Sequence, residues 1–455
     1  MSTAAVVNPE PAPVVKASKP RLTNSTLLAL AGAVLLLAPL AFGAVEPWST
    51  FVLEACAVVL VLTWASRQWL NRQLDVAFNP LYPPMGAFFA LALVQWLFRS
   101  TAYRHVTYTH FLLYAAYGML AFVSTQCFRR TSQFDWVTNA IAIYGGVLAA
   151  FAILQGVAPN GKLYWIWLPQ QGGAIYGPYV NHNHYAGLME MLIPFPLALA
   201  ASRVAEGNRK IFSMIAAGLM TGSIFLSGSR GGMLAILVQA AVLAVLVLRS
   251  QRGNWKQPLL LGGVLILAIG LLVWLGGNEL SQRLASIHSE ARAELDGGMR
   301  LTIDRDCWHM FLQKPILGWG LGTFPIVYGG FRSFFSTFFV NQAHNDYLQL
   351  LVETGVAGFA IAIWFLVLVF RHGFAKLNDW NQTASGVFTT ASLLGCIGIL
   401  VHSFFDFNLQ IPANAALFYV LCAFATASPL VESQRRRVAR RRHLAAEPRP
   451  DETPS

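Results

Sequence analysis

The chain has 455 residues, of which 55% are hydrophobic and only 12% are charged. Soluble domains usually carry about 25% charged residues, so this composition excludes a soluble globular protein and indicates a polytopic membrane protein. The formal net charge of +11 could suggest nucleic acid as a partner. However, the arginine clusters at 435–437 and 440–442 follow the last apolar segment, where basic side chains meet anionic lipid headgroups. We therefore expect the lipid bilayer, and no nucleic acid, as the partner of these clusters.

Twelve apolar segments are long enough to cross a bilayer, which requires about 17–25 helical residues. The sequence therefore predicts an all-α polytopic membrane protein with about twelve transmembrane helices. The expected spans lie at 26–44, 50–66, 81–98, 108–127, 137–157, 184–202, 211–227, 232–248, 257–275, 345–370, 385–405 and 412–428. The first span is too long, and too closely followed by others, to be a cleaved signal peptide.

The positions of lysine and arginine predict the orientation of these spans, because basic loops remain in the cytoplasm. With the N-terminus inside, most basic residues fall on the cytoplasmic side and the long polar loop faces outward. We expect five regions along the chain. They are a disordered cytoplasmic N-terminus at 1–22, nine spans within 23–275, the long outer loop at 276–344, three spans within 345–428, and a basic disordered cytoplasmic tail at 429–455.

The long loop combines short predicted helices with arginines. An apolar stripe over 280–295, with polar residues between its members, predicts an amphipathic helix on the bundle or membrane surface. A second short helix is expected over about 300–313, ending at a Lys-Pro pair. Arg300 either meets an anionic substrate or pairs with Asp304 one turn later. Arg305 either binds substrate or lies on a solvated face.

A glycine-rich stretch at 318–322 and an aromatic patch at 331–339 follow these helices. The glycines resemble a phosphate-binding loop, but no strand precedes them and no GK[ST] follows. The sequence therefore excludes a nucleotide site there.

The segment 181–187 places polar side chains directly before an apolar span. Asn181 or Asn183 can cap that helix, whose free N–H groups also favour anions. His182 and His184, two residues apart, could ligate a metal, but no third ligand lies at a familiar spacing. Helix capping and substrate binding by Asn183 and His184 are the remaining alternatives.

Arg230 lies in a tight hairpin, 226–233, rich in serine and glycine, between two spans. Its planar guanidinium can bind two phosphate oxygens at once. The alternative is an interfacial arginine that extends to lipid headgroups. An arginine on the outer side runs against the charge rule, which favours a functional role.

Acid–base candidates lie at two span ends. His344 opens the tenth span together with Asn345, Asp346 and Tyr347, and Asp346 is close enough in sequence to orient His344 as a general base. Glu353 lies seven residues after Asp346, on the same helix face.

A second such group ends the eleventh span. His402 and Asp406 are four residues apart and are expected to share a helix face. They either bind substrate or form a satisfied polar contact between helices.

In this context the chain resembles the superfamily of O-antigen ligases and Wzy-type polymerases, which are bacterial inner-membrane proteins. The matching motifs occur in the family's order, and together they span about 180–360. They are NHNHYAG at 181–187, SGSRGG at 227–232, GMRL at 298–301 with Trp308, PILGWGLG at 315–322, HNDYLQ at 344–349 and ETGVAG at 353–358.

The resemblance implies a metal-independent, inverting glycosyltransferase of the membrane C type, without a cofactor, whose active site faces the periplasm. The donor would be a glycan on undecaprenyl diphosphate. The acceptor would be lipid A core or protein for a ligase, or another lipid-linked glycan for a polymerase. By position, Arg230 and Arg300 would hold the diphosphate and His344 would assist the acceptor. The chain lacks the soluble C-terminal repeat domain of some protein-glycosylating relatives, which makes a protein acceptor less expected.

Two other functions compete with glycan transfer. A twelve-span transporter could use the intramembrane carboxylates Glu54 and Glu190 as proton or ion sites. No internal repeat joins the two halves of the chain, and the asymmetric outer loop does not suit pseudo-symmetric rocking. A catalytically silent scaffold of an envelope-polysaccharide complex would need neither Arg230 nor His344.

Overall fold

The structure is a computed structural model that describes residues 23–72, 74–169, 174–250, 299–335 and 339–427. Over these ranges it contains helices and no strand. The α-helices are α1 Asn24–Leu37, α2 Pro47–Leu70, α3 Tyr82–Leu97, α4 Arg104–Cys127, α5 Ser132–Val157, α6 His182–Leu192, α7 Pro194–Ala201, α8 Gly207–Ser227, α9 Arg230–Ser250, α12 Met299–Gln313, α13 Phe324–Val327, α14 Asp346–Phe374, α15 Ala384–His402 and α16 Pro412–Thr426. Short 3₁₀ turns occur at Phe42–Ala44, Tyr328–Gly330 and Asn408–Gln410.

The described helices confirm the prediction of an all-α polytopic membrane protein. Eight of them are long and apolar enough to cross a membrane, with α6 and α7 together forming one such span. The apolar helices α1, α3 and α16 are shorter. Every expected span within the described residues coincides with one of these helices, and the short loop helix expected over 300–313 is α12. The expected span at 257–275, the amphipathic helix at 280–295 and both terminal regions lie outside the described residues.

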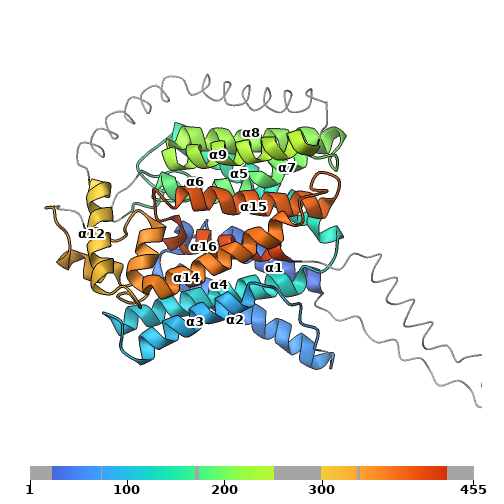
Figure 1. Ribbon diagram of the computed structural model, residues 1–455. Helices are drawn as coiled ribbons and strands as arrows, with labels where there is room; N and C mark the ends of the chain where they lie inside the picture. Colours follow the sequence, from blue (N-terminus) through green and yellow to red (C-terminus); the bar gives the residue numbers. More distant parts are fainter. Residues whose placement is uncertain (1–22, 73, 170–173, 251–298, 336–338, 428–455) are drawn as a thin grey trace, which may run out of the picture.

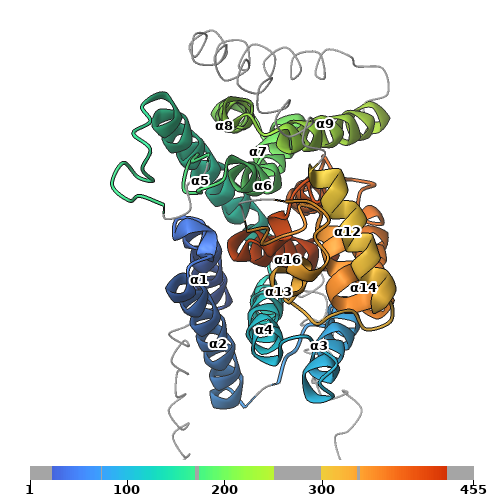
Figure 2. The same ribbon diagram turned by 90° about the vertical axis from the view of Figure 1, so that its left-hand side faces the viewer.

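Most helices run side by side, and α12 stands across one end of the bundle (Figure 1). Figure 2 looks onto that end, with α5 to α9 on one side, α1 to α4 on the other and α16 between them. Helix α15 packs against α6, α7, α9 and α16, and α16 also packs against α4. The C-terminal half of the bundle therefore joins its two sides.

The span formed by α6 and α7 lies at the centre of its side of the bundle. Of its most apolar stretch, 94% is buried, against 28% for α2. Pro194 begins α7 and has no backbone N–H to continue the hydrogen bonds of α6, so the helix breaks there. This span consequently contacts protein on nearly all sides.

Helix α14 is kinked at Gly355, whose φ of 63° and ψ of −168° are not helical. The backbone groups that the kink leaves unpaired are taken up by the loop at 315–320. The bonds are Trp319 N–H to Val352 O at 2.9 Å, Gly320 N–H to Glu353 O at 2.9 Å, Val356 N–H to Pro315 O at 2.8 Å and Ala357 N–H to Ile316 O at 3.2 Å. A Cβ at Gly355 would lie 2.3 Å from the Ile316 carbonyl oxygen, so the close approach requires glycine.

The side chain of Glu353 completes this junction. Its carboxylate accepts hydrogen bonds from the backbone N–H groups of Gly322 at 2.8 Å and Phe324 at 3.2 Å, and from Gln349 at 3.3 Å. Glu353 is 2% exposed. The glycine-rich stretch therefore closes the loop against α14.

A second small core holds the loop helices on α14. It contains Ile303, Cys307 and Met310 of α12, Phe324 and Tyr328 from α13 and the turn after it, and Val352 of α14. This packing keeps α12 across the end of the bundle, where the candidate site lies.

We predict that Glu353→Ala lowers the stability of the folded protein. Removing the carboxylate leaves two buried backbone N–H groups without an acceptor, and each such group costs about 1–3 kcal/mol. Thermal unfolding of the purified protein measures the loss, and proteolysis near 317–328 localises it. The matched control is Glu206→Ala, whose side chain is exposed. A melting temperature equal to that of the control would contradict this role for Glu353.

Candidate functional site

Five segments that are distant in sequence converge at the end of the bundle crossed by α12 (Figures 1 and 2). They are the starts of α6, α9, α12 and α14, and the turn that follows α15. The candidate residues for glycan transfer lie on these segments or directly beside them.

His344 lies two residues before the start of α14, in a left-handed conformation with a φ of 55°. Few residues other than glycine adopt this conformation, so the packing around His344 must maintain it. Its Nδ1 lies 3.5 Å from Oδ1 of Asp406, and its ring meets Phe407 edge-on with centroids 4.8 Å apart. The imidazole is 30% exposed, whereas Asp406 is 1% exposed. His344 is thus accessible and backed by a buried carboxylate.

Asp406 is surrounded by imidazoles. Burial by itself raises the pKa of its carboxyl, but the contact with His344 and the neighbouring rings of His184 and His402 hold that pKa well below its usual range. Asp406 is therefore ionised at neutral pH and favours a positive charge on a nearby imidazole.

Asp346 does not orient His344, which corrects the expectation from sequence. Its carboxylate accepts hydrogen bonds from Ser403 Oγ at 2.8 Å, from the Leu409 N–H at 3.1 Å and from Gln410 Nε2 at 3.2 Å. Asp346 is 5% exposed. It joins the start of α14 to the segment after α15.

The two neighbours of Asp346 also have structural contacts. Asn345 caps α14, because its side-chain oxygen accepts from the N–H groups of Tyr347 and Leu348, both at 3.2 Å. The Tyr347 hydroxyl donates to the Leu400 carbonyl at 2.6 Å. Asn345, Asp346 and Tyr347, which the sequence predicts as substrate ligands, thus also have partners within the protein.

The arginines of the site contact or flank the turn after α15. Arg300 donates from Nη1 to the Phe405 carbonyl at 2.9 Å. Arg230 is exposed at the first position of α9, and the next residue, Gly231, packs on the ring of His402. Arg305 is exposed on α12. Two arginines thus come from segments that meet at one turn.

Asp304, one turn after Arg300, was expected only as its ion-pair partner. Burial raises the pKa of Asp304, while a hydrogen bond with Asn345 and the charges of Arg300 and His344 partly oppose this rise. The contact with Asn345 links α12 to α14. No pattern in the sequence indicated this link.

At the start of α6, Asn181 caps the helix and His184 packs against the segment after α15. Asn181 is the N-cap, and its side chain accepts the N–H of Asn183 at 2.8 Å. His184 is 7% exposed, and its Nδ1 lies 3.3 Å from Oδ1 of Asn408. Within the described residues, no group of three or more His, Cys, Asp and Glu side chains is arranged to hold a metal ion.

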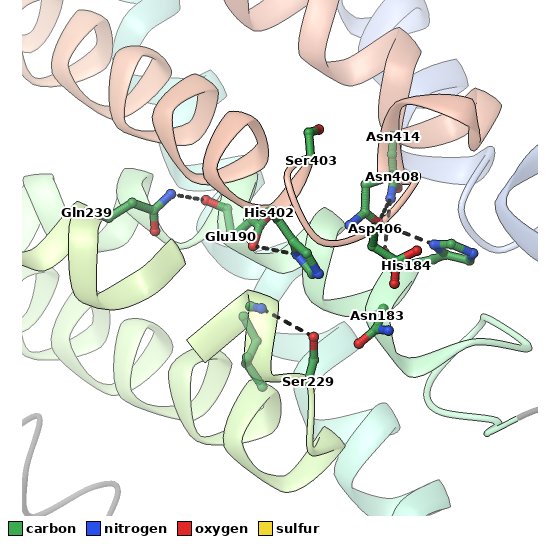
Figure 3. A network of polar contacts seen from close by, with 12 residues as sticks. Asn183, His184, Glu190, Ser229, Gln239, His402, Ser403, Asp406, Asn408 and Asn414 are labelled. Carbon is green, nitrogen blue, oxygen red and sulfur yellow. Dashed lines mark hydrogen bonds and ion pairs between the residues drawn. The ribbon is translucent and has the colours of Figure 1, made fainter. Parts of the chain in front are cut away.

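His402 and Asp406 do not share a helix face as expected, because α15 ends at His402. Asp406 contacts His344. His402 turns into the bundle instead, and its Nδ1 lies 3.1 Å from Oε2 of Glu190 (Figure 3). His402 is 1% exposed and Glu190 is fully buried. The pairing of His402 with Glu190, across 212 positions, had no signal in the sequence.

Residues 215–363 match the family model described as O-Antigen ligase. This part of the chain is similar to the O-antigen ligase family. This match contains Arg230, Arg300 and His344 and most of the ordered motifs. It supports glycan transfer of the ligase or polymerase type at the level of the family. No curated protein matches the chain.

The matched region does not include the whole candidate site. His184, Glu190, His402 and Asp406 lie outside 215–363. The structure nevertheless brings Asp406 to His344 and places His402 against Gly231. Residues on both sides of the matched region therefore complete the site.

We predict that Asp346→Ala destabilises the protein more than Ser403→Ala does. The first change removes the acceptor of three hydrogen bonds, each contributing about 0.5–1.5 kcal/mol, and the second removes only one. Thermal unfolding of the purified variants gives their melting temperatures and so ranks the two losses of stability. Equal melting temperatures for Asp346→Ala and wild type would exclude Asp346 as the residue that joins α14 to this segment.

Proposed function

We propose that this protein transfers a glycan from undecaprenyl diphosphate to an acceptor at the periplasmic face of the bacterial inner membrane, as an O-antigen ligase. Both termini would be cytoplasmic. In the structure, the first described residues and the end of α16 lie at the end of the bundle opposite α12 (Figure 1). Such an arrangement is compatible with a site on the outer face.

The observation that carries this proposal is the convergence of one histidine and two arginines on the segment 402–406. His344 meets it through Asp406, Arg300 through the Phe405 carbonyl, and the Arg230 segment through the ring of His402. A base and two anion-binding groups are the parts that an inverting transfer from a diphosphate requires.

In the proposed step, His344 takes the proton of the acceptor hydroxyl. The acceptor oxygen attacks the anomeric carbon, and the bond from that carbon to the diphosphate oxygen breaks. The electron pair leaves with undecaprenyl diphosphate, and direct displacement inverts the anomeric centre. Arg230 and Arg300 neutralise the charge that develops on the leaving group, where a metal ion acts in other enzymes.

Asp406 supports His344 in this step. Its buried carboxylate, 3.5 Å from Nδ1, favours the imidazolium that forms when the ring accepts a proton. It also favours the tautomer in which Nδ1 carries a hydrogen and the other ring nitrogen is free to act as the base. This is the role that the sequence assigned to Asp346.

An apolar cavity beside the site supports a lipid-borne substrate. It lies between α3, α4, α14 and α16, is lined by side chains such as Phe88, Phe365 and Tyr419, and extends to Asp346 and Tyr347. We assign it to part of the polyprenyl chain. The hydrocarbon would then lie next to the position of the diphosphate.

We predict that His344→Ala and Arg230→Ala abolish glycan transfer while the protein still folds in the membrane. Loss of a general base lowers a rate by about 10²–10⁴-fold. Loss of one group that neutralises transition-state charge costs about 10²–10³-fold. Transfer by the purified protein in nanodiscs gives the rates.

The matched controls for these variants are His105→Ala and Arg104→Ala. Both residues are exposed at the start of α4, away from the 402–406 segment. We expect them to retain wild-type rates. Wild-type product from His344→Ala and Arg230→Ala would exclude the proposed site.

Transfer is also expected to persist in EDTA, because the guanidiniums take the place of a divalent ion. The rate is measured before and after chelation and again after adding Mg²⁺ or Mn²⁺. Activity that EDTA removes and a divalent ion restores would contradict the metal-independent mechanism and favour a metal at His182 and His184.

A polymerase is the alternative that shares these motifs. The identity of the acceptor molecule distinguishes it from a ligase. We expect purified protein given a lipid-linked glycan and several acceptors to attach the glycan to lipid A core, as mass spectrometry would detect. A ladder of lengthening lipid-linked chains would instead identify a polymerase. Absence of transfer to every acceptor would favour the transporter.

A further inference from the structure

The proposed transfer step leaves the buried pair of His402 and Glu190 without a role. Their Nδ1 and Oε2 atoms are 3.1 Å apart, and the two side chains are 1% and 0% exposed. Neither side chain reaches the open end of the bundle, so neither can touch a substrate. Ionisable groups inside a membrane bundle are costly and are retained mainly where they serve function.

The edge of the imidazole opposite Glu190 supports the start of α9. A Cβ built on Gly231 would lie 2.4 Å from Cδ2 and 2.5 Å from Nε2 of His402. The ring therefore lies directly against the backbone of Gly231, the residue that follows Arg230. Movement of the ring would allow this backbone, and with it the base of the Arg230 side chain, to shift.

Glu190 is itself held by a residue of α9. Gln239 donates from Nε2 to the Glu190 carbonyl at 2.7 Å and to the Leu394 carbonyl at 2.8 Å (Figure 3). A Cβ on Gly398 would come within 2.1 Å of this nitrogen, so the amide fills the space between α6, α9 and α15. The pair is thus supported by the helix whose first residue is Arg230.

We propose that His402 and Glu190 are positioning residues that hold Arg230 in the orientation in which it binds the lipid diphosphate. Glu190 fixes the ring of His402, and the ring fixes the backbone at Gly231. This inference rests on the proposed function, because it takes the diphosphate as the ligand of Arg230. Neither positioning residue contacts the reacting atoms.

The test measures binding of undecaprenyl diphosphate to the full-length protein in nanodiscs. We expect Glu190→Ala and His402→Ala each to weaken binding roughly 10-fold, a size typical of coupled neighbouring residues. Glu190→Gln keeps an acceptor for the His402 ring and should bind almost as wild type does. In an Arg230→Ala background, Glu190→Ala should cause no further loss, because the group that it positions is already absent.

A glycine substitution tests the same contact without removing a polar group. Gly231→Ala forces the His402 ring to move, and we expect it to weaken binding as Glu190→Ala does. The matched control is Gly32→Ala in α1, where an added Cβ has no heavy atom within 4 Å. This variant decides the question if Glu190→Ala does not fold.

Three outcomes would overturn the positioning role. In the first, Glu190→Ala weakens binding equally with and without Arg230. In the second, Glu190→Ala binds as wild type does. In the third, Gly231→Ala binds as well as Gly32→Ala does. Failure of the proposed function is distinct, since wild type and Arg230→Ala would then bind undecaprenyl diphosphate alike.

Discussion

The architecture of the site depends on the buried carboxylate of Asp346. Three donors from the segment 403–410 surround it, in an interior where a buried polar group without partners costs more than each bond contributes. His344 lies two residues before this carboxylate, and Asp406 lies within the segment that it binds. The contact between His344 and Asp406 therefore follows from the way Asp346 joins α14 to the end of α15.

The membrane-spanning helices could be predicted from the sequence because hydropathy is a local property, readable one segment at a time. The same holds for α12, whose start and end are signalled by nearby residues. The junction at Gly355 could not be predicted in this way. There a loop from 315–320 replaces hydrogen bonds within α14, and neither segment alone shows that its backbone groups are paired across such a distance. The motifs at these positions indicated a family without revealing that they build one junction.

The structure brings the candidate residues together, but with partners other than those that their spacing in the sequence suggested. Spacing within a helix suggested Asp346 for His344 and grouped His402 with Asp406, because sequence reasoning extends a helix until a clear stop signal appears. The end of α15 at His402 separates that second pair, and one member turns into the bundle while the other turns to His344. Partners contributed by α6, more than two hundred residues earlier, arise only from tertiary packing.

The central position of the α6–α7 span has a consequence for biogenesis. This segment has the lowest hydropathy of the eight long spans and carries Glu190, so it is the one least able to partition into lipid alone. The groups that accommodate it, Gln239 and His402, are translated 49 and 212 residues later. Stable integration of α6–α7 must therefore await the synthesis of α15, because a chain that ends before α15 leaves the carboxylate of Glu190 without its histidine partner.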